Sequence, residues 1–375
     1  MRIALGLVVL LAIGAALVSG GSPADSIRQR YVLDGNELRT VVEYGRARVV
    51  DVRSLGDAGA ISTGRRWLAR ARPLGPGAPG WARRMYRRSL VVLRAMSDRR
   101  GVVVAGLRDG WEYVWPRDAS AAAMAFATAG YRAEARRIAD FLRGLDLGAA
   151  ARFQRDGTPV AGRAAQGDAA GWVAAAARAA GVRANVSRLQ WRDRADYQEG
   201  ESGDYLGNAI ASAAAAPEGA SAGDLSARRL AEGKIRKEFG AGSVLVREAG
   251  EPGSGVDSAA AWAVRPFSLP SLYPLARRTL LRIAAESGRY GIVPSQNWSG
   301  GVDPWTAPTA WTAWSLAALG ERRVALRLMA ELRRDETPSG LLPERVDTRI
   351  GIPTSTTPLA WSHAFAILAL RQLWP

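Results

Sequence analysis

The chain contains no cysteine and one histidine, His363, among its 375 residues. Without cysteine there is no disulfide, no thiolate nucleophile, no lipoprotein anchor and no cysteine-ligated zinc site. A single histidine cannot form a multi-histidine metal site, and we expect His363 to cap a helix or to contact a hydroxyl group. No glycine-rich stretch carries a phosphate-loop lysine, which argues against nucleotide binding. We therefore expect neither a metal ion nor an organic cofactor.

Lysine is nearly absent as well. Only Lys234 and Lys237 are lysines, so arginine supplies almost all of the 51 basic residues behind the formal net charge of +16. The arginines are spread along the whole chain and form no basic arm, which indicates codon bias rather than a nucleic-acid site. We expect no nucleic-acid partner, although weak affinity for anionic lipid or wall polymer is compatible with this charge.

The N-terminus has the pattern of an export segment. Met1 and Arg2 are followed by an apolar run over residues 3–18, which is long for a signal-peptide core and short for a membrane span. Small residues follow, so that cleavage after Gly20 or Ala24 fits. Residues 1–24 are thus predicted to be either a cleaved signal peptide or an uncleaved anchor that tethers the protein through residues 3–18. Both alternatives place the remainder outside the cytoplasm, in the extracellular space or the cell envelope.

Residues 25–81 differ in character from the rest and are predicted to form a small N-terminal arm and linker. Residues 31–33 and 38–44 read as two strands around an Asp-Gly-Asn turn, and residues 47–52 read as a third strand. Prolines interleaved with glycines over residues 73–79 mark the linker.

From residue 82 the sequence becomes a succession of helical segments. Some, such as 169–180, are apolar on all sides and are expected to be buried, whereas others, such as 133–145, are amphipathic and expected at the surface. Alternating buried and surface helices joined by short turns predict an all-α fold, an (α/α)6 barrel of helical hairpins with a short irregular or β N-terminal arm. The predicted helices are one short of the twelve that six hairpins need, and they cover residues 81–96, 119–129, 133–145, 168–180, 204–216, 222–239, 257–264, 272–287, 308–319, 321–333 and 359–373.

Polar and aromatic clusters precede several of the helices expected to be buried. They cover residues 110–118, 166–168, 196–201, and 340–347 together with 358–363. The inner helices of such a barrel run in one direction, so their N-terminal ends gather at one end of the ring. We therefore expect the clusters to share one site.

Three of these motifs carry a family resemblance. Trp-Pro-Arg-Asp at 115–118, Leu-Pro-Glu-Arg-Val-Asp at 342–347 and Pro-Leu-Ala-Trp-Ser-His at 358–363 occur in an order that resembles the bacterial glucoamylase-type glycoside hydrolases, family 15 and its relatives. The resemblance covers residues 82–375 and implies a six-hairpin glycosidase domain over that range. It also implies exo-acting hydrolysis of terminal α-linked glucose from an oligosaccharide, with inversion.

The resemblance implies two catalytic carboxyl groups. Glu344 matches the family's general base, which activates water, and Glu199 falls where the general acid is expected. The family's acid is followed directly by a second glutamate, whereas this chain has Gly200 there and Glu201 one position later. Glu201 is therefore the substitute candidate for the acid.

Further residues match the positions at which the family binds sugar. An arginine–aspartate pair holds hydroxyl groups at the scissile bond, and tryptophans provide packing surfaces. Asp303-Pro304-Trp305 resembles an aromatic motif of the same subsite, and Arg289-Tyr290 resembles a sugar contact with unusual spacing. The substrate-binding residues implied are Trp115, Arg117, Asp118, Glu201, Trp305 and Trp361.

The chemistry requires a particular arrangement of the two carboxyl groups. Inverting hydrolysis needs one protonated and one ionised carboxyl group on opposite faces of the sugar, roughly 6.5–9.5 Å apart. Burial against tryptophan would keep the acid protonated. The rival interpretations are a hydrolase of trehalose or another envelope glycan, and a non-catalytic carbohydrate-binding envelope protein whose altered acid motif is inactive. The rivals are separated by whether Glu199 faces Glu344 or points into solvent.

Overall fold

A computed structural model describes most of the chain beyond residue 65, together with one hairpin before it. In the hairpin, β1 (Tyr31–Asp34) pairs antiparallel with β2 (Glu37–Thr40), with Tyr31 opposite Thr40, which confirms the predicted strand pair. The predicted third strand at 47–52 and the export segment at 3–18 lie outside the described residues. Within the described part, no helix is long and apolar enough to cross a membrane. The structure describes residues 31–34, 37–40, 66–107, 110–184, 186, 189–215 and 222–375.

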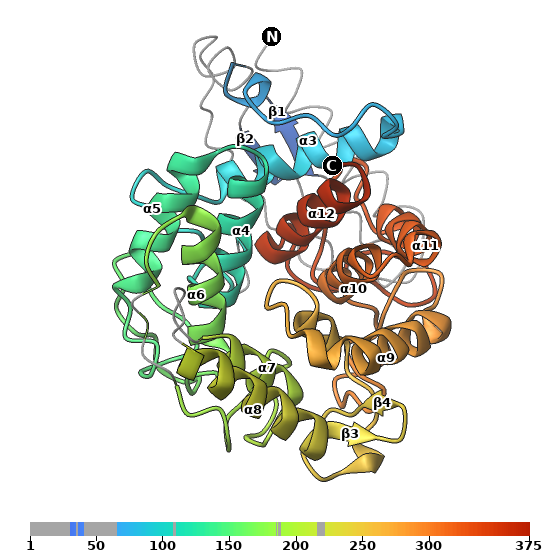
Figure 1. Ribbon diagram of the computed structural model, residues 1–375. Coiled ribbons are helices and arrows are strands. Elements are labelled where there is room, and N and C mark those ends of the chain that lie inside the picture. The colour runs from blue at the N-terminus through green and yellow to red at the C-terminus, as the bar shows by residue number, and fades with distance from the viewer. Residues whose placement is uncertain are drawn as a thin grey trace, which may run out of the picture.

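Six helical elements form a closed inner ring, in which each packs on the next and the last packs on the first (Figure 1). Their side chains are buried nearly all round, because they are rich in alanine and tryptophan. In ring order they are α4 (Pro116–Thr128), α6 (Ala169–Ala180), α7 (Leu206–Ala214), the 3-10 helix η3 (Ser258–Ala263), α10 (Thr306–Ala318) and α12 (Ala360–Leu373).

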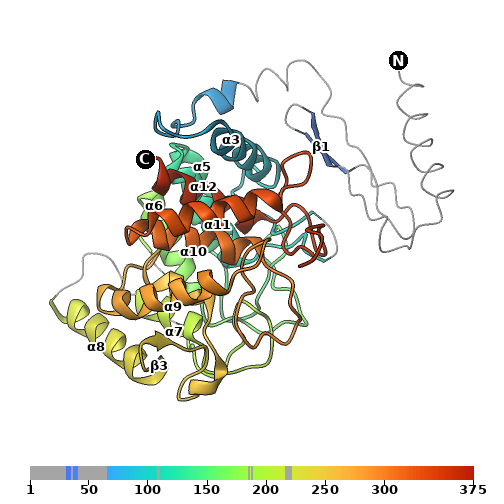
Figure 2. The same ribbon diagram turned by 90° about the vertical axis from the view of Figure 1, so that its right-hand side faces the viewer.

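Amphipathic helices cover the ring from outside (Figures 1 and 2). In α5, for example, only Ala135, Ile138, Ala139 and Leu142 are buried, a spacing that places them on one face. Inner and outer helices alternate along the chain except between α6 and α7, and this arrangement confirms the predicted all-α (α/α)6 barrel. The outer helices are α3 (Gly80–Ala95), α5 (Arg132–Arg143), α8 (Ala222–Phe239), α9 (Tyr273–Glu286) and α11 (Arg322–Arg334).

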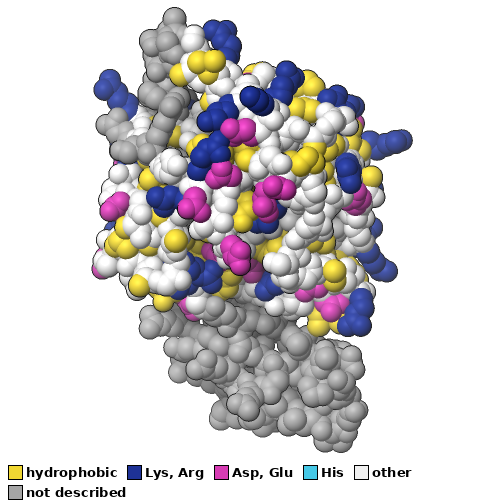
Figure 3. Space-filling view, turned by 90° about the horizontal axis from the view of Figure 1, so that it is seen from below, with side chains coloured by type: hydrophobic (Ala, Val, Ile, Leu, Met, Phe, Trp, Pro, Cys, Tyr) yellow, Lys and Arg dark blue, Asp and Glu magenta, His cyan; other side chains and the backbone are white. Residues whose placement is uncertain are grey.

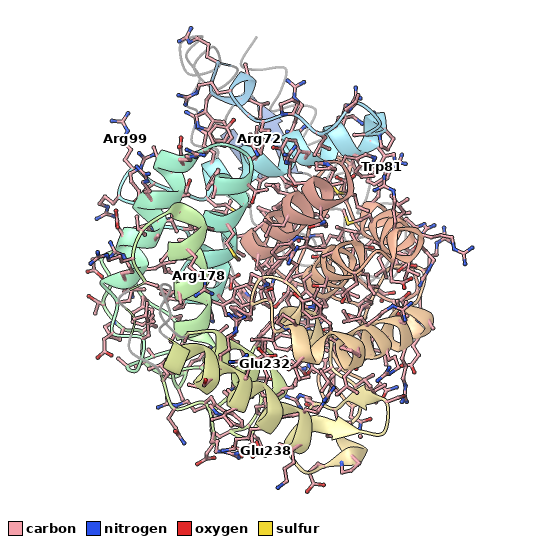
Figure 4. The ribbon with its side chains drawn as sticks, viewed as in Figure 1. Arg72, Trp81, Arg99, Arg178, Glu232 and Glu238 are labelled. Atoms are coloured by element: carbon pink, nitrogen blue, oxygen red, sulfur yellow. The ribbon has the colours of Figure 1, made fainter. Side chains whose placement is uncertain are left out.

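The helix that six hairpins would require between α6 and α7 is replaced by an irregular segment over the described residues 189–205. Arg192 fastens this segment by donating to Glu238 at 2.7 Å and by pairing with Asp204. Glu238 lies at the end of α8, on the outside of the ring (Figure 4). The segment that carries the expected acid is thus an irregular connection.

One predicted helix, over residues 257–264, is not an α-helix. Residues 258–263 form the 3-10 helix η3, in which the Asp257 carboxylate accepts the Ala259 backbone N–H at 2.6 Å. Pro266 follows closely and cannot donate the backbone hydrogen bond that a continuing α-helix needs. The short element still fills its place in the inner ring.

Close approach of the inner helices depends on small residues. A side chain added at Gly171 in α6 would lie 2.2 Å from the Ala211 carbonyl oxygen in α7, so these helices meet backbone to backbone.

The loops before the inner helices meet at one end of the ring. Isolated β-bridges join Trp305 to both Ile292 and Arg345, and join Val114 to Phe153. The residues immediately before the inner elements thus share one region, as the sequence predicted. They are Trp115, Asp168, Tyr205, Asp257, Trp305 and Leu359.

The surface charge follows the distribution of arginine along the chain. On the face seen in Figure 3, Lys and Arg side chains are dispersed among acidic, apolar and other groups rather than gathered in one patch. The net charge of +16 is therefore not concentrated on this face.

Candidate active site

Glu344 lies in the connection between α11 and α12 and is held by its backbone. Its N–H donates to the Thr356 carbonyl at 2.9 Å, and its carbonyl accepts the Thr306 N–H at 3.1 Å. Thr306 is the first residue of the inner helix α10. The glutamate is therefore fixed between a neighbouring loop and an inner helix, with only 3% of its surface exposed.

The Glu344 carboxylate has both a hydroxyl and a cationic neighbour. It accepts a hydrogen bond from Ser355 Oγ, and Arg345 Nε lies 3.7 Å away. Burial raises the pKa of Glu344, while the Ser355 hydrogen bond and the charges of Arg345 and Arg163 act in the opposite direction. The site thus contains groups that favour the ionised form of a buried carboxyl.

His363 supports the loop that carries Glu344. Its Nε2 accepts the Leu342 N–H at 3.0 Å, and its Nδ1 lies 2.9 Å from Ser89 Oγ. Burial lowers the pKa of His363 to about 3, so the ring is neutral and Nε2 is free to accept a hydrogen bond. His363 therefore contacts a hydroxyl group, one of the two roles expected, and does not cap a helix.

Arg117 is buried among polar and aromatic partners. Its Nη1 donates to Gln166 Oε1 and to Asp168 Oδ2, each at 2.8 Å, and its guanidinium carbon lies 4.8 Å from the ring centroid of Trp361. The structure thereby joins the clusters at 115–118, 166–168 and 358–363, as the sequence predicted.

Asp118 lies beside Glu344 rather than at a helix cap. The helix α4 begins at Pro116 with Trp115 at the cap position and no side-chain capping bond, so Asp118 does not cap it. Burial raises the pKa of Asp118 to about 7; the charge of Arg117 lowers it and the charge of Glu344 raises it further. The charge of Glu344 therefore acts on Asp118, which relates the two carboxyl groups to one site.

Two tryptophans border the same region. The Trp305 and Trp361 rings are 6.3 Å apart, and Trp298, which the sequence did not single out, packs edge-on against Trp305 at 5.3 Å. Trp305 is also bridged through its backbone to Arg345, the residue after Glu344.

Glu199 approaches from the irregular segment before α7. Its Oε1 accepts the Trp115 Nε1–H at 2.8 Å, and its other oxygen pairs with Arg163. Its φ is +56°, a left-handed conformation that costs a non-glycine residue about 1–2 kcal/mol. The surrounding contacts therefore impose a conformation on Glu199 that it would not adopt alone.

A buried polar cluster holds the turn that ends at Glu199. Asp257 accepts hydrogen bonds from the Tyr197 hydroxyl at 2.9 Å and from Gln198 Nε2 at 2.8 Å, and Arg247 lies 3.3 Å from Asp196. Burial raises the pKa of Asp257 to about 7, Asp196 raises it further and Arg247 lowers it. The turn is thereby attached to the start of the inner element η3.

Glu201 is not brought to the other site residues. It is exposed, and its carbonyl oxygen accepts the Tyr205 hydroxyl at 2.9 Å. Gly200 is also exposed, and a side chain added there would meet no atom within 4 Å. Over the described residues, Glu199 and not Glu201 therefore faces the tryptophan and arginine groups.

Arg163 connects the two candidate catalytic groups. Arg163 forms the ion pair with Glu199. Burial raises the pKa of Glu344 and the charge of Arg163 lowers it, while burial lowers the pKa of Arg163 and the charge of Glu344 raises it. Arg163 is thus paired with Glu199, and its charge also acts on Glu344. The sequence did not single out this arginine.

Several buried polar atoms of the residues grouped with Glu344 have no hydrogen-bond partner among the described residues. Both carboxylate acceptors and N–H donors are among them, and within the described part of the chain they have no hydrogen bond. A ligand rich in hydroxyl groups would satisfy both kinds, because each hydroxyl donates and accepts. The atoms are Asp118 Oδ1, Asp168 Oδ1, Arg117 Nε, Arg345 Nε, Trp305 Nε1 and Trp361 Nε1.

Arg289 and Tyr290 stand apart from this group. Arg289 is exposed and lies 5.6 Å from the Tyr290 ring, which packs against Gly351. In the part of the chain that is described, neither contacts Glu344, Glu199 or Arg117.

The chain shares its ring of helical hairpins with solved structures of glycosidases, glucoamylases among them. No family model and no curated protein matches the chain in sequence. Among solved structures, a wild-type glycosidase aligns over 79% of this chain and 99% of its own, with 20% identity and a TM-score of 0.66.

Two glucoamylases share the fold at lower identity. A bacterial glucoamylase complexed with acarbose covers 84% of this chain and 58% of its own, with 15% identity and a TM-score of 0.60. The glucoamylase of Saccharomycopsis fibuligera covers 77% and 93%, with 13% identity and a TM-score of 0.57. A variant of the first glycosidase was determined in complex with glucose.

Proposed function

We propose that the protein is an inverting glycoside hydrolase that removes terminal α-linked glucose from an oligosaccharide. The observation that carries this proposal is the group of unpartnered donors and acceptors around Glu344. It suits a sugar, and it lies on a fold shared with glycosidases, one of them determined in complex with glucose.

In this mechanism Glu344 is the general base. Its carboxylate takes a proton from a water molecule as that water attacks the anomeric carbon. The buried pair Arg117 and Asp118 holds the sugar hydroxyl groups so that the reacting carbon stays in place. Glu199 is the general acid and protonates the leaving oxygen.

A screen of residues 25–375 against maltose, maltooligosaccharides, isomaltose and trehalose tests the proposal. Nuclear magnetic resonance of the first product formed should show β-glucose, because attack by water inverts the anomeric carbon. Release of α-glucose would rule out inversion. Hydrolysis of trehalose alone would favour the alternative of a trehalose hydrolase.

One observation favours a second candidate, a non-catalytic carbohydrate-binding protein. The ion pair of Arg163 with Glu199 favours an ionised carboxylate, which cannot protonate a leaving group. Sugar binding without any turnover in the same screen would support this candidate.

The predictions about export remain proposals. We propose that residues 1–24 direct residues 25–81 and the helical domain of residues 82–375 to the cell envelope or the extracellular space. Mass determination of the protein's N-terminus from its native cells would separate cleavage after Gly20 or Ala24 from an intact anchor.

A further inference from the structure

Two arginines lie over the aromatic surface beside Glu199. We call this surface the aromatic platform; it consists of Trp111, Tyr113 and Trp115, with the two tryptophans stacked at 5.0 Å. The guanidinium carbon of Arg152 lies 4.7 Å from the Tyr113 ring centroid and 5.5 Å from that of Trp115, and that of Arg163 lies 5.9 Å from Trp115. The aromatic platform therefore bears two positive charges.

Arg163 is paired with the carboxyl group from which the reaction needs a proton. Its charge also acts on Glu344. An adjacent guanidinium stabilises an ionised carboxylate, whereas protonation of a leaving oxygen requires the acid form. Glu199 can act as the acid only after Arg163 has moved to another anion.

Depth in the site indicates which part of a substrate meets this arginine. Arg117, Asp118 and Glu344 are each at most 3% exposed, whereas the Arg163 side chain is 38% exposed. In an exo-acting enzyme the terminal sugar enters the deep part and the leaving group remains nearer to solvent. The leaving group, rather than the terminal sugar, is therefore the part that reaches Arg163.

We propose that the preferred substrate carries a carboxylate on its leaving group, which takes Arg163 away from Glu199. This inference rests on the proposed hydrolase function. A substrate carboxylate can replace the Glu199 carboxylate as the partner of Arg163, because the planar guanidinium matches the geometry of a carboxylate. Arg152 provides a second positive charge on the same platform.

The exchange leads directly into hydrolysis. Released from its ion pair, the Glu199 carboxylate takes a proton from solvent. Water then attacks the anomeric carbon and gives a proton to Glu344, while the bond from that carbon to the leaving oxygen breaks and this oxygen takes the proton of Glu199. The products are a neutral sugar and an alcohol that still bears its carboxylate.

Matched substrates test the inference. Maltobionate and maltitol differ only in a carboxylate against a hydroxymethyl group at the end of the leaving group, and the 1→6-linked pair isomaltobionate and isomaltitol differs in the same way. We expect kcat/KM to be about ten- to a hundredfold higher for the acid member, the range of one charge-assisted hydrogen bond. Equal values, or a preference for the neutral member, would overturn the inference.

Variants connect this preference to Arg163. Arg163→Gln should abolish the preference, so that kcat/KM becomes equal for maltobionate and maltitol. Arg163→Lys should restore part of it. Arg155→Gln is the matched control, since Arg155 is an exposed arginine of the same loop, and it should keep the full preference. Loss of the preference in Arg155→Gln to the same extent would mean that general surface charge is responsible.

A binding measurement separates this inference from the proposed function. In the Glu344→Gln variant, calorimetry should show maltobionate bound about tenfold or more tightly than maltitol. Hydrolysis of both without any preference would leave the hydrolase proposal intact and refute the inference. Preferential binding of maltobionate without turnover by the unaltered protein would refute the hydrolase and retain the recognition of a carboxylate.

Discussion

The two halves of the candidate site are built differently. Glu344 is almost fully buried, and its loop is fixed to α10 through Thr306 and to α12 through His363. Glu199 lies on an irregular segment, with a positive φ and an arginine as its ion-pair partner. Both groups lie in connections, but the backbone of Glu344 is hydrogen-bonded to an inner helix, whereas the carboxyl group of Glu199 is held by an ion pair that can exchange, so we infer a fixed base and an adjustable acid.

The largest effect is expected from Glu344→Gln. The amide has nearly the same shape but cannot accept a proton from water, so turnover should fall by roughly 10²–10⁴-fold while sugar binding is retained. Steady-state kinetics and calorimetry measure the two quantities. If more than about a tenth of the rate remained, Glu344 would not be the general base.

Removing the acid should have a smaller and more selective effect. In Glu199→Gln the Trp115 hydrogen bond can persist, but proton donation is lost, so kcat should fall about 10²–10³-fold for sugars with poor leaving groups. The pH–rate profile should also lose its alkaline limb. Glu201→Gln is the matched control because Glu201 is exposed, and a loss in Glu201→Gln as large as in Glu199→Gln would reassign the acid.

The fixed half should depend on its support. In His363→Ala the buried Leu342 N–H would lose its acceptor, which should lower the free energy of unfolding by about 1–3 kcal/mol. If His363 positions the loop of Glu344, kcat of His363→Ala should fall while KM changes little. In His363→Gln the amide oxygen can accept the Leu342 N–H, so this variant should recover part of the rate. Denaturant unfolding and kinetics of both variants measure this; a KM effect alone would contradict it.

The pH dependence of stability involves both halves. Burial raises the pKa of Asp118, beside Glu344, and of Asp257, beside the Glu199 turn, from 3.8 to about 7. Each carboxyl binds its proton more tightly in the folded state, so its stabilisation is complete below about pH 4 and is lost as the pH rises through about 7. The pKa of His363 is lowered from 6.5 to about 3, so its contribution to stability has the opposite sign. That contribution is complete above about pH 6.5 and is lost as the pH falls toward 3.

Burial also raises the pKa of other carboxyl groups, among them Glu344 and Glu336, so raised carboxyl groups outnumber the one lowered histidine. We therefore expect Tm to fall from pH 5 to pH 8, on the order of 5 °C. Asp118→Asn and Asp257→Asn should each flatten this slope, and scanning calorimetry at both pH values measures it. An unchanged slope in both variants would contradict the raised pKa of these two groups.

The smallest effect is expected beside the adjustable acid. Gly200→Ala adds a methyl group where no atom lies within 4 Å, so stability should change by less than about 0.5 kcal/mol. Gly171→Ala, in the closely packed contact of α6 with α7, should cost several times more, since its new atom would meet the Ala211 carbonyl. Equal stabilities of the two variants, measured by thermal unfolding, would refute this reading of the packing.

Much of the fold could be predicted from the sequence because its signals are local. The apolar inner helices, the amphipathic outer ones and the β1–β2 pair follow from periodicity and turn residues. The predicted helix over residues 222–239 coincides with α8 (Ala222–Phe239). The 3-10 form of η3 was missed because composition alone does not separate a short 3-10 helix from an α-helix.

The site was predicted less evenly, for a related reason. The clusters at 115–118, 342–347 and 358–363 precede inner helices, and topology brings them together. Arg163 escaped notice because almost every basic residue of this chain is an arginine, so no local signal distinguished it. The contacts of Ser355, Trp298 and Asp257 depend on tertiary packing and have no local pattern.

The central claim, a base at Glu344 and an acid at Glu199, is tested most directly with α-glucosyl fluoride. Fluoride leaves without protonation, so hydrolysis of this substrate needs a base but no acid. We expect Glu199→Gln to hydrolyse α-glucosyl fluoride at a rate within about tenfold of the unaltered protein, whereas Glu344→Gln should lose about 10²-fold or more. Equal losses in the two variants, or a larger loss in Glu199→Gln, would contradict the assignment.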